Sequence, residues 1–161
     1  MNYILFPHKL GQLHSGISKT PNIIKDYLVR NKKSKLIYDV PCSNNNLFKN
    51  ISELYTANVR CKGKRINIGG DHSMSIASIA YSINKYKNLK VIWIDAHADI
   101  NTTYSSKTKN YHGMPLSFLT GLDYDKRFNF IKNTLKFENI LYIGLRDIDN
   151  YEKKVIETCN I

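Results

Sequence analysis

The sequence predicts an α/β fold, a three-layer sandwich in which a mainly parallel sheet carries helices on both faces. Short apolar runs of strand length alternate with longer segments whose apolar residues recur at helical spacing. Strands separated by helices need crossover connections, which make neighbouring strands parallel. No repeat or low-complexity linker divides the 161 residues, so we expect a single domain over residues 1–161.

The first half of the chain is expected to contain three strands and two helices. The strands are the runs 3–6, 36–38 and 65–68. A helix opens at Thr20-Pro21, because threonine is a good N-cap and proline suits the first helical turn. Loops are expected at 7–20 and 41–46. The inner face of the first helix is expected to hold Ile23, Ile24, Tyr27 and Leu28, and the second helix contains Ile51, Leu54 and Tyr55.

The second half continues the alternation. The uninterrupted apolar run 91–94 is typical of a strand that a parallel sheet buries on both faces. A further helix is expected near 125–136, and a fifth strand at 140–143. Two other helices are indicated by apolar faces, one of Ile76, Ile79, Ala80 and Ile83, the other of Tyr151, Val155, Ile156 and Cys159.

Three metal-ligating side chains follow the run 91–94. If the extended backbone continues, Asp95, His97 and Asp99 point to the same side, because alternate residues of a strand share a face. Two carboxylates and an imidazole at the carboxyl end of a buried strand suit a divalent metal. The alternative is a strand that leaves the core through a polar loop.

A fourth candidate ligand follows the strand 65–68. Gly69 and Gly70 permit a tight turn into the next helix, and His72 lies in that turn, at the mouth of the same crevice. A histidine alone here would indicate a helix terminus. With the acidic cluster one strand later, the ligand interpretation is favoured.

These segments resemble the ureohydrolase family, and within it the arginases. The resemblance includes a Gly-Gly-Asp-His motif and an Asp-Ala-His-x-Asp motif, and it covers nearly the whole chain. Asn101 favours arginase over agmatinase. The matching segments are 69–72, 95–99, 112–119 and 144–149, with Pro7, Gly11, Gln12, Gly16 and Pro21 fitting the first loop.

The resemblance implies a binuclear Mn²⁺ hydrolase that converts L-arginine and water to ornithine and urea. His72 matches a ligand of one ion and His97 a ligand of the other, while Asp95 matches the carboxylate that bridges both. Asp99 matches a ligand that also contacts the attacking hydroxide. His112 matches the proton-shuttling histidine, which suits an imidazole whose ordinary pKa lies near neutrality.

Three residues match those that hold the amino-acid end of the substrate: Asn101, Thr108 and Asp149. Asp149 with Glu152 is also a helix N-terminus signature, so capping is an equal alternative. The family has serine where Thr108 stands and glycine where Lys109 stands, which puts the geometry of this loop in question.

The resemblance also implies a fold truncated at its C-terminus. The family's downstream Asp-x-Asp metal motif and its guanidinium-binding glutamate are absent from this sequence. The second ion site then retains only His97 and Asp95. The family's sheet order places the missing strands between 65–68 and 91–95. The two strand groups therefore close up, receive strands from a second polypeptide, or fold poorly.

Composition restricts the rival functions. The net charge is +11, but the lysines are scattered and no RNA-binding signature accompanies them, so nucleic acid is not expected. No apolar stretch is long enough to span a membrane. The three cysteines are widely spaced, which favours a reduced, cytoplasmic protein without zinc or disulfides.

Two hypotheses remain beside arginase activity. One is a catalytically inactive metal-binding or interaction module with an arginase-like fold. The other is an agmatinase-type or formiminoglutamase-type ureohydrolase. The expected partners are L-arginine and either a homo-oligomer or a complementing C-terminal half.

Overall fold

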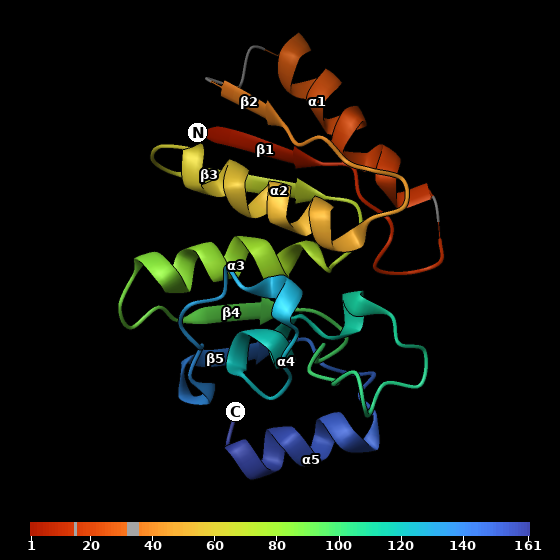
Figure 1. Ribbon diagram of the computed structural model, residues 1–161, viewed down its shortest axis with the longest axis vertical. Coiled ribbons are helices and arrows are strands. Elements are labelled where there is room, and N and C mark those ends of the chain that lie inside the picture. Colours follow the sequence, from red (N-terminus) through yellow and green to blue (C-terminus); the bar gives the residue numbers. More distant parts are fainter. Residues whose placement is uncertain (15, 32–35) are drawn as a thin grey trace.

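The computed structural model describes residues 1–14, 16–31 and 36–161 (Figure 1). Its strands form two parallel sheets, so the α/β class is confirmed. The first sheet has the order β2-β1-β3, and the second pairs β4 with β5. The strands are β1 (Asn2–Phe6), β2 (Leu36–Asp39), β3 (Arg65–Gly69), β4 (Val91–Ile94) and β5 (Ile140–Ile143).

The register brings the carboxyl ends of the strands to corresponding edges. Ile4 of β1 lies opposite Tyr38 and Asn67, and Trp93 of β4 lies opposite Tyr142. The five α-helices are α1 (Thr20–Arg30), α2 (Leu47–Arg60), α3 (Met74–Lys85), α4 (Pro115–Thr120) and α5 (Asn150–Cys159). Short 3₁₀ helices cover Gly16–Lys19, Tyr111–Gly113, Lys126–Phe128 and Phe137–Asn139.

The two sheets do not join. Among the described residues β3 and β4 are not paired, so the two strand groups do not close up. In Figure 1, α3 runs between the sheets, and it contacts both α2 and α4. Helix packing therefore connects the two strand groups in the described part of the chain.

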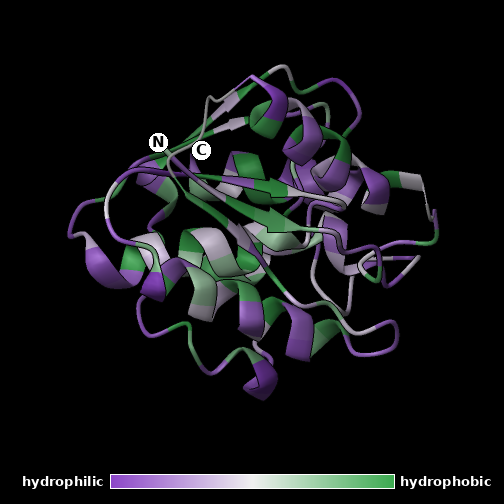
Figure 2. Cartoon of the chain, turned by 90° about the horizontal axis from the view of Figure 1, so that it is seen from above, coloured by the Kyte–Doolittle hydropathy of each residue, from purple (hydrophilic) through white to green (hydrophobic). Residues whose placement is uncertain are grey.

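The second sheet is covered on one face only. Trp93 is 4% exposed and Ile140 is also buried, but Ile94 on the opposite face is 75% exposed. Ile92, Leu141 and Ile143 share that open face. The prediction that 91–94 is buried on both faces is therefore wrong, because no described element packs against this side of the pair. Figure 2 shows apolar residues concentrated on the strands that cross the molecule.

Two helix predictions need correction. The stretch 125–136 contains only the 3₁₀ turn Lys126–Phe128, and the rest is irregular. Its apolar residues Phe128, Phe130 and Leu135 enter the core separately instead of forming one helical face. In contrast, α4 was not expected; it begins at Pro115 and ends at Thr120, where Gly121 with a φ of 81° terminates the helix.

The inner face of α1 is narrower than predicted. Leu28 and Pro21 are buried, but Ile23 and Tyr27 are exposed and Ile24 is intermediate. The helix contacts β1 and β3, and its two buried residues, Pro21 and Leu28, lie seven positions apart. The start at Thr20 with proline in the first turn is as predicted, although the N-cap position is Lys19.

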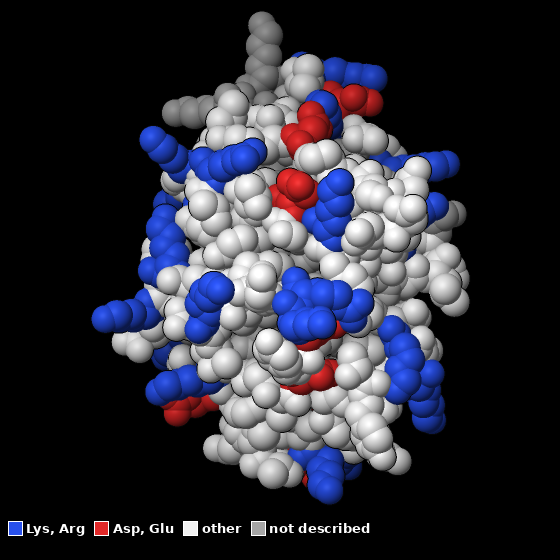
Figure 3. Space-filling model, viewed as in Figure 1, with Lys and Arg blue, Asp and Glu red and all other residues white. Residues whose placement is uncertain are grey.

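Charge and hydropathy fit a folded domain with a basic surface. Lys and Arg side chains are spread over the face seen in Figure 3, with acidic residues between them. In the described part of the chain, no helix has both the length and the apolarity needed to cross a bilayer.

Candidate metal centre

The turn after β3 brings His72 to the edge of the first sheet. Gly70 passes so close to the carbonyl oxygen of His8 that a Cβ atom would clash with it, which explains the glycine. The backbone N–H of Gly70 donates to Phe6 at 3.0 Å, and that of Asp71 donates to His8 at 3.2 Å. These bonds hold the turn against the segment after β1.

The segment after β4 leaves the strand conformation at once. The Asp95 N–H still donates to Ile143 of β5, at 3.1 Å, but its Oδ1 accepts the N–H of His97 at 3.0 Å and turns the chain. Asp99 has a φ of 49°, in the left-handed region. The predicted convergence by continued strand alternation is therefore wrong in its cause. A turn brings Asp95 and Asp99 together and directs His97 elsewhere.

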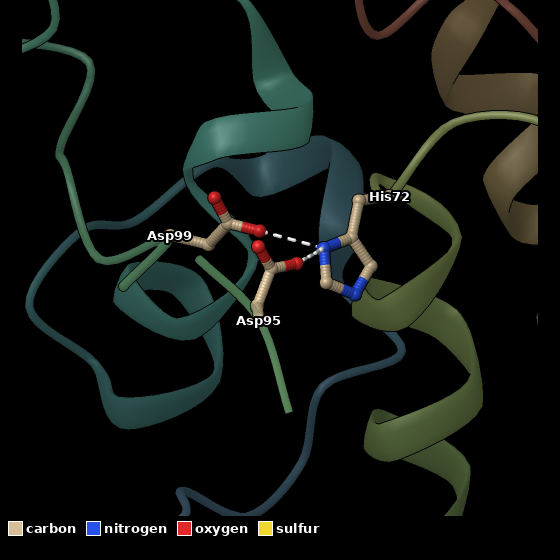
Figure 4. A group of neighbouring side chains, drawn as sticks. All are labelled: His72, Asp95 and Asp99. Atoms are coloured by element: carbon tan, nitrogen blue, oxygen red, sulfur yellow. Dashed lines mark ion pairs between the residues drawn. The ribbon is translucent and has the colours of Figure 1, made fainter. Parts of the chain in front are cut away.

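His72, Asp95 and Asp99 form one cluster, with ligand atoms within 4.8 Å of one another (Figure 4). The Nδ1 atom of His72 lies 2.7 Å from Asp99 Oδ2 and 3.2 Å from Asp95 Oδ2. Its ring stacks on Trp93 with a centroid distance of 4.6 Å. Three predicted ligands from two separate segments of the sequence thus form one cluster.

The cluster shifts the pKa values of its members. Burial alone would lower the pKa of His72, but the hydrogen bond and charge of Asp99, with the charge of Asp95, raise it overall. Burial would raise the pKa of Asp95, but the His97 N–H and the two neighbouring histidines lower it. The cluster therefore favours cationic ligands, whether protons or metal ions.

His97 lies beside this cluster but is not part of it. Its Nδ1 atom is 3.3 Å from Asp95 Oδ1, and its Nε2 atom is 3.4 Å from Asp147 Oδ2. Asp95 therefore presents one oxygen to His72 and the other to His97. Asp147 was not among the predicted site residues; its only signal was its place in the segment 144–149.

His112 lies on the other side of the cleft, in the turn Tyr111–Gly113. Its Nδ1 atom lies 2.8 Å from the carbonyl oxygen of Gly11, and its backbone N–H donates to the same oxygen at 3.1 Å. A carbonyl only accepts hydrogen bonds, so Nδ1 carries the proton and Nε2 is left for other partners.

Asn101 and Asp149 join across 48 residues of sequence, with the Asn101 amide donating to Asp149 Oδ2 at 2.7 Å. Asp149 Oδ1 accepts the N–H groups of Tyr151 and Glu152, both at 2.9 Å. Glu152 completes a capping box by accepting the Asp149 N–H. Capping and a position in the cleft are thus compatible, because each function uses a different oxygen.

The loop with Thr108 keeps a glycine-like backbone despite Lys109. Lys109 has a φ of 58°, which costs a residue with a side chain about 1 kcal/mol. Its ammonium group donates to the carbonyls of Thr103 and Tyr104 at 2.6 and 3.1 Å. Its own N–H donates to Ser106 Oγ at 3.1 Å. These bonds fix the loop in a conformation that the sequence left in question.

Every predicted site residue lines one cleft of about 420 Å³. Glu152 also lines it and was missed as a site residue; burial raises its pKa above the ordinary value. The residues predicted for the site are His72, Asp95, His97, Asp99, Asn101, Thr108, His112 and Asp149.

Comparison with known proteins identifies the family and the fold of this chain. The model of the arginase family matches residues 9–161. The arginase of Plasmodium falciparum is 46% identical over 117 residues, which are 70% of this chain and 28% of that protein. The crystal structure of Bacillus subtilis arginase superposes with a TM-score of 0.88 and 31% identity, over 99% of this chain and 61% of that chain.

A second solved structure, Entamoeba histolytica arginase in complex with L-ornithine, has a TM-score of 0.82 and 26% identity. It covers 99% of this chain and 62% of its own. The chain thus spans less than two thirds of the relatives it matches, and nearly all of it takes part in the match. On its matched length, its strand arrangement and its motifs, this chain belongs to the arginase family.

Proposed function

We propose that this chain forms the larger part of an arginase-type active site for hydrolysis of L-arginine to L-ornithine and urea. The observation that carries the proposal is the convergence of His72, Asp95 and Asp99 in one cleft. Asn101 and Asp149 lie at the same cleft and supply an amide and a carboxylate. Such groups suit the ammonium and carboxylate of an amino acid.

The cluster fits Mn²⁺. Two ligands of an octahedral ion with bonds of about 2.2 Å lie about 3.1 Å apart. His72 Nδ1 is 2.7 and 3.2 Å from its two carboxylate partners, close to that value. Hard carboxylate oxygens with an imidazole are donors that manganese accepts. When bound, the metal supplies Lewis-acid activation of water near neutral pH.

The remaining residues divide the other tasks. His72, Asp95 and Asp99 would hold the first ion, and His97 together with Asp95 would contribute to a second. This second site has fewer donors here, so we expect it to bind more weakly. His112 accepts or donates a proton at Nε2, since its Nδ1 is engaged by Gly11. Asn101, Thr108 and Asp149 orient the amino-acid end of the substrate.

A partner that completes the site belongs to the same proposal. In the described part of the chain β3 and β4 do not pair with each other, and the open face of β4 and β5 is apolar. A segment equivalent to a C-terminal half, with further strands and carboxylates, would pair with the free strand edges and cover the apolar face. We favour this over a homo-oligomer, because a second copy also carries a net charge of +11.

We place the protein in the cytoplasm, where Cys42, Cys61 and Cys159 remain free thiols.

A second candidate is a non-catalytic metal-binding or interaction module. It is favoured by the edges of β3 and β4 that have no partner strand in the described part of the chain, and by the exposure of His97, whose side chain is 55% accessible. Agmatinase-type or formiminoglutamase-type activity is a third. The pairing of Asn101 with Asp149 favours an amino-acid substrate over agmatine, which lacks the carboxylate.

The test measures Mn²⁺ binding by calorimetry and urea release from arginine, with agmatine and formiminoglutamate as competing substrates. We expect one Mn²⁺ to bind to the purified chain. We expect urea release when a polypeptide corresponding to the unmatched part of Bacillus subtilis arginase is added. His72→Asn abolishes both, whereas His14→Asn, which changes an exposed histidine that does not line the cleft, changes neither. Metal binding without turnover in any mixture would support the module instead.

A further inference from the structure

The segment after β1 connects the two halves of the cleft. On one side it bonds to the turn that carries His72, through Gly70 to Phe6, Asp71 to His8 and Gly11 to Asp71. On the other side the carbonyl of Gly11 accepts two hydrogen bonds from His112. Gly11 thus bonds both to the turn that carries His72 and to the turn that carries His112.

Asp71 fixes the position of Gly11. Its carboxylate is buried, and Oδ2 accepts the Gly11 N–H at 2.9 Å. Oδ1 accepts the N–H of Ser73 at 3.0 Å and also the Ser73 hydroxyl. A Cβ atom on Gly11 would clash with the Asp71 carboxylate, so the loop approaches the carboxylate as closely as a backbone can. Each oxygen therefore has a separate task, one toward the loop and one toward α3.

The backbone N–H and C=O groups of Gly11 connect Asp71 to His112. The N–H of Gly11 is tied to Asp71 while its C=O faces His112, so moving the residue moves the acceptor of the imidazole. With Nδ1–H donating at 2.8 Å, the neutral ring carries its lone pair on Nε2. His112 lines the cleft, and Nε2 is the nitrogen left free to act there.

We propose that Asp71 is a positioning residue for His112, acting through Gly11 to hold the imidazole in the Nδ1–H tautomer. Asp71 touches neither the cleft nor His112. This role deepens the proposed function, because the position of Asp71 determines which His112 nitrogen faces the substrate. The catalytic meaning of the link rests on the proposed role of His112, but the tautomer itself can be tested without activity.

The experiment measures ¹⁵N chemical shifts of the histidine rings at alkaline pH, where imidazoles are neutral. No manganese is added, because the paramagnetic ion broadens nearby signals. His112→Gln identifies the His112 resonances by their loss. We expect His112 to be almost entirely Nδ1–H in the unaltered chain. In Asp71→Asn, one amide oxygen replaces two carboxylate oxygens, and the Nε2–H form that free histidine prefers becomes the major species.

Two controls separate positioning from general damage. Ser73→Ala removes a partner of Asp71 Oδ1 but leaves the Gly11 bond, so it retains the Nδ1–H form. Asp71→Glu keeps both oxygens on a longer side chain and restores the Nδ1–H form in part. A folded Asp71→Asn variant with His112 still Nδ1–H would overturn the proposal.

A measurement on the unaltered chain covers the case in which Asp71→Asn does not fold. The Gly11 amide and the His112 Nδ1–H are expected to exchange slowly with solvent and with similar protection, because both belong to one hydrogen-bonded link. A Gly11 amide that exchanges as fast as an exposed loop, or a His112 that is mainly Nε2–H, contradicts the link. In that event Asp71 serves only the local turn.

Discussion

Asn101 and Asp149 face each other across the cleft, and the hydrogen bond between them uses an Asp149 oxygen that the helix cap leaves free. Oδ2 accepts the Asn101 amide, while Oδ1 accepts the first N–H groups of α5. The N-terminus of α5 thereby places a carboxylate oxygen at the site while its N-cap hydrogen bonds remain intact. The two interpretations of Asp149 from sequence therefore describe two oxygens of one group.

Replacing Asp149 with serine separates these functions. Serine is a good N-cap, so the free energy of unfolding should change by less than about 0.5 kcal/mol, whereas Asp149→Ala should cost about 1 kcal/mol. Serine cannot reach Asn101 as the carboxylate does, so both variants should weaken L-arginine binding alike. Urea denaturation and calorimetry check this. Equal stability of the serine and alanine variants, or unchanged arginine binding, would contradict the division.

Metal affinity should depend on pH through His72. The pKa of His72 is raised above its ordinary value of 6.5, so protons compete with the metal to a higher pH than at an unperturbed histidine. Mn²⁺ affinity is expected to fall as the pH is lowered through that raised pKa. Calorimetric titrations between pH 5 and 9 check the dependence. An affinity independent of pH in this range would mean that His72 is not a ligand.

The metal-free chain should show the opposite dependence in its stability. Protonated His72 is stabilised by Asp99 and Asp95 in the folded chain. Its contribution to the free energy of unfolding is fully present below the unfolded pKa of 6.5 and is lost as the pH rises through the raised folded value. Urea denaturation of the unaltered chain and of His72→Asn, without metal, measures it. The two stability curves should converge at alkaline pH and separate at acidic pH.

The strands and the cluster of His72, Asp95 and Asp99 were predictable because their signals are local. Apolar runs mark β1, β3, β4 and β5, and motifs at fixed spacing mark the candidate ligands. The stretch 125–136 was not predictable, because one distant side chain holds it. Asn84 donates to the carbonyl of Phe130 and accepts the N–H groups of Lys132 and Asn133. Satisfied backbone groups remove the need for a helix, and no local pattern reveals a partner about 46 residues away.

The contacts that were missed at the site also depend on residues that are distant in the sequence. Asp147 and Glu152 reach the cleft because the last segment bonds to residues that follow β4: the Asp147 N–H donates to Ala96, and the Ile100 N–H donates to Glu152. Gly11 reaches His112 across 101 residues. The motifs predicted which side chains meet. They did not predict the turn at Asp95, because the end of a strand depends on which hydrogen bonds its last residues find. Here Asp95 bonds to β5 through its N–H and turns the chain with its own carboxylate.

The two faces of β4 should respond differently to substitution. Trp93→Ala removes a buried side chain that stacks on His72, and should cost about 3–5 kcal/mol. Ile94→Lys lies on the open face and should change the free energy of unfolding by less than about 0.5 kcal/mol. It should also reduce self-association at high concentration, because it interrupts an exposed apolar surface. Urea denaturation and sedimentation velocity measure the two effects. A large loss of stability in Ile94→Lys would show that this face is covered.

Asp125 should stabilise the irregular stretch 125–136 in a pH-dependent way. Arg127 binds both of its oxygens, with Nε at 2.8 Å from Oδ1, and the Arg127 N–H donates to Oδ1 at 2.9 Å. The hydrogen bond from Arg127 is the largest cause that lowers the pKa of Asp125 below 3.8. The stabilisation is therefore present above pH 3.8 and is lost as the pH falls through the lowered folded value.

We expect Asp125→Asn to lower the free energy of unfolding at pH 7 by about 1 kcal/mol, and the difference to vanish in acid. Urea denaturation at several pH values measures it. Asp26→Asn, which changes an exposed carboxylate on α1, is the matched control and should show little difference at any pH. If the Asp125→Asn difference stays constant down to pH 2, the ionised carboxylate is not what anchors the stretch. Burial of Phe128 and Phe130, together with the Asn84 hydrogen bonds, would then account for its position.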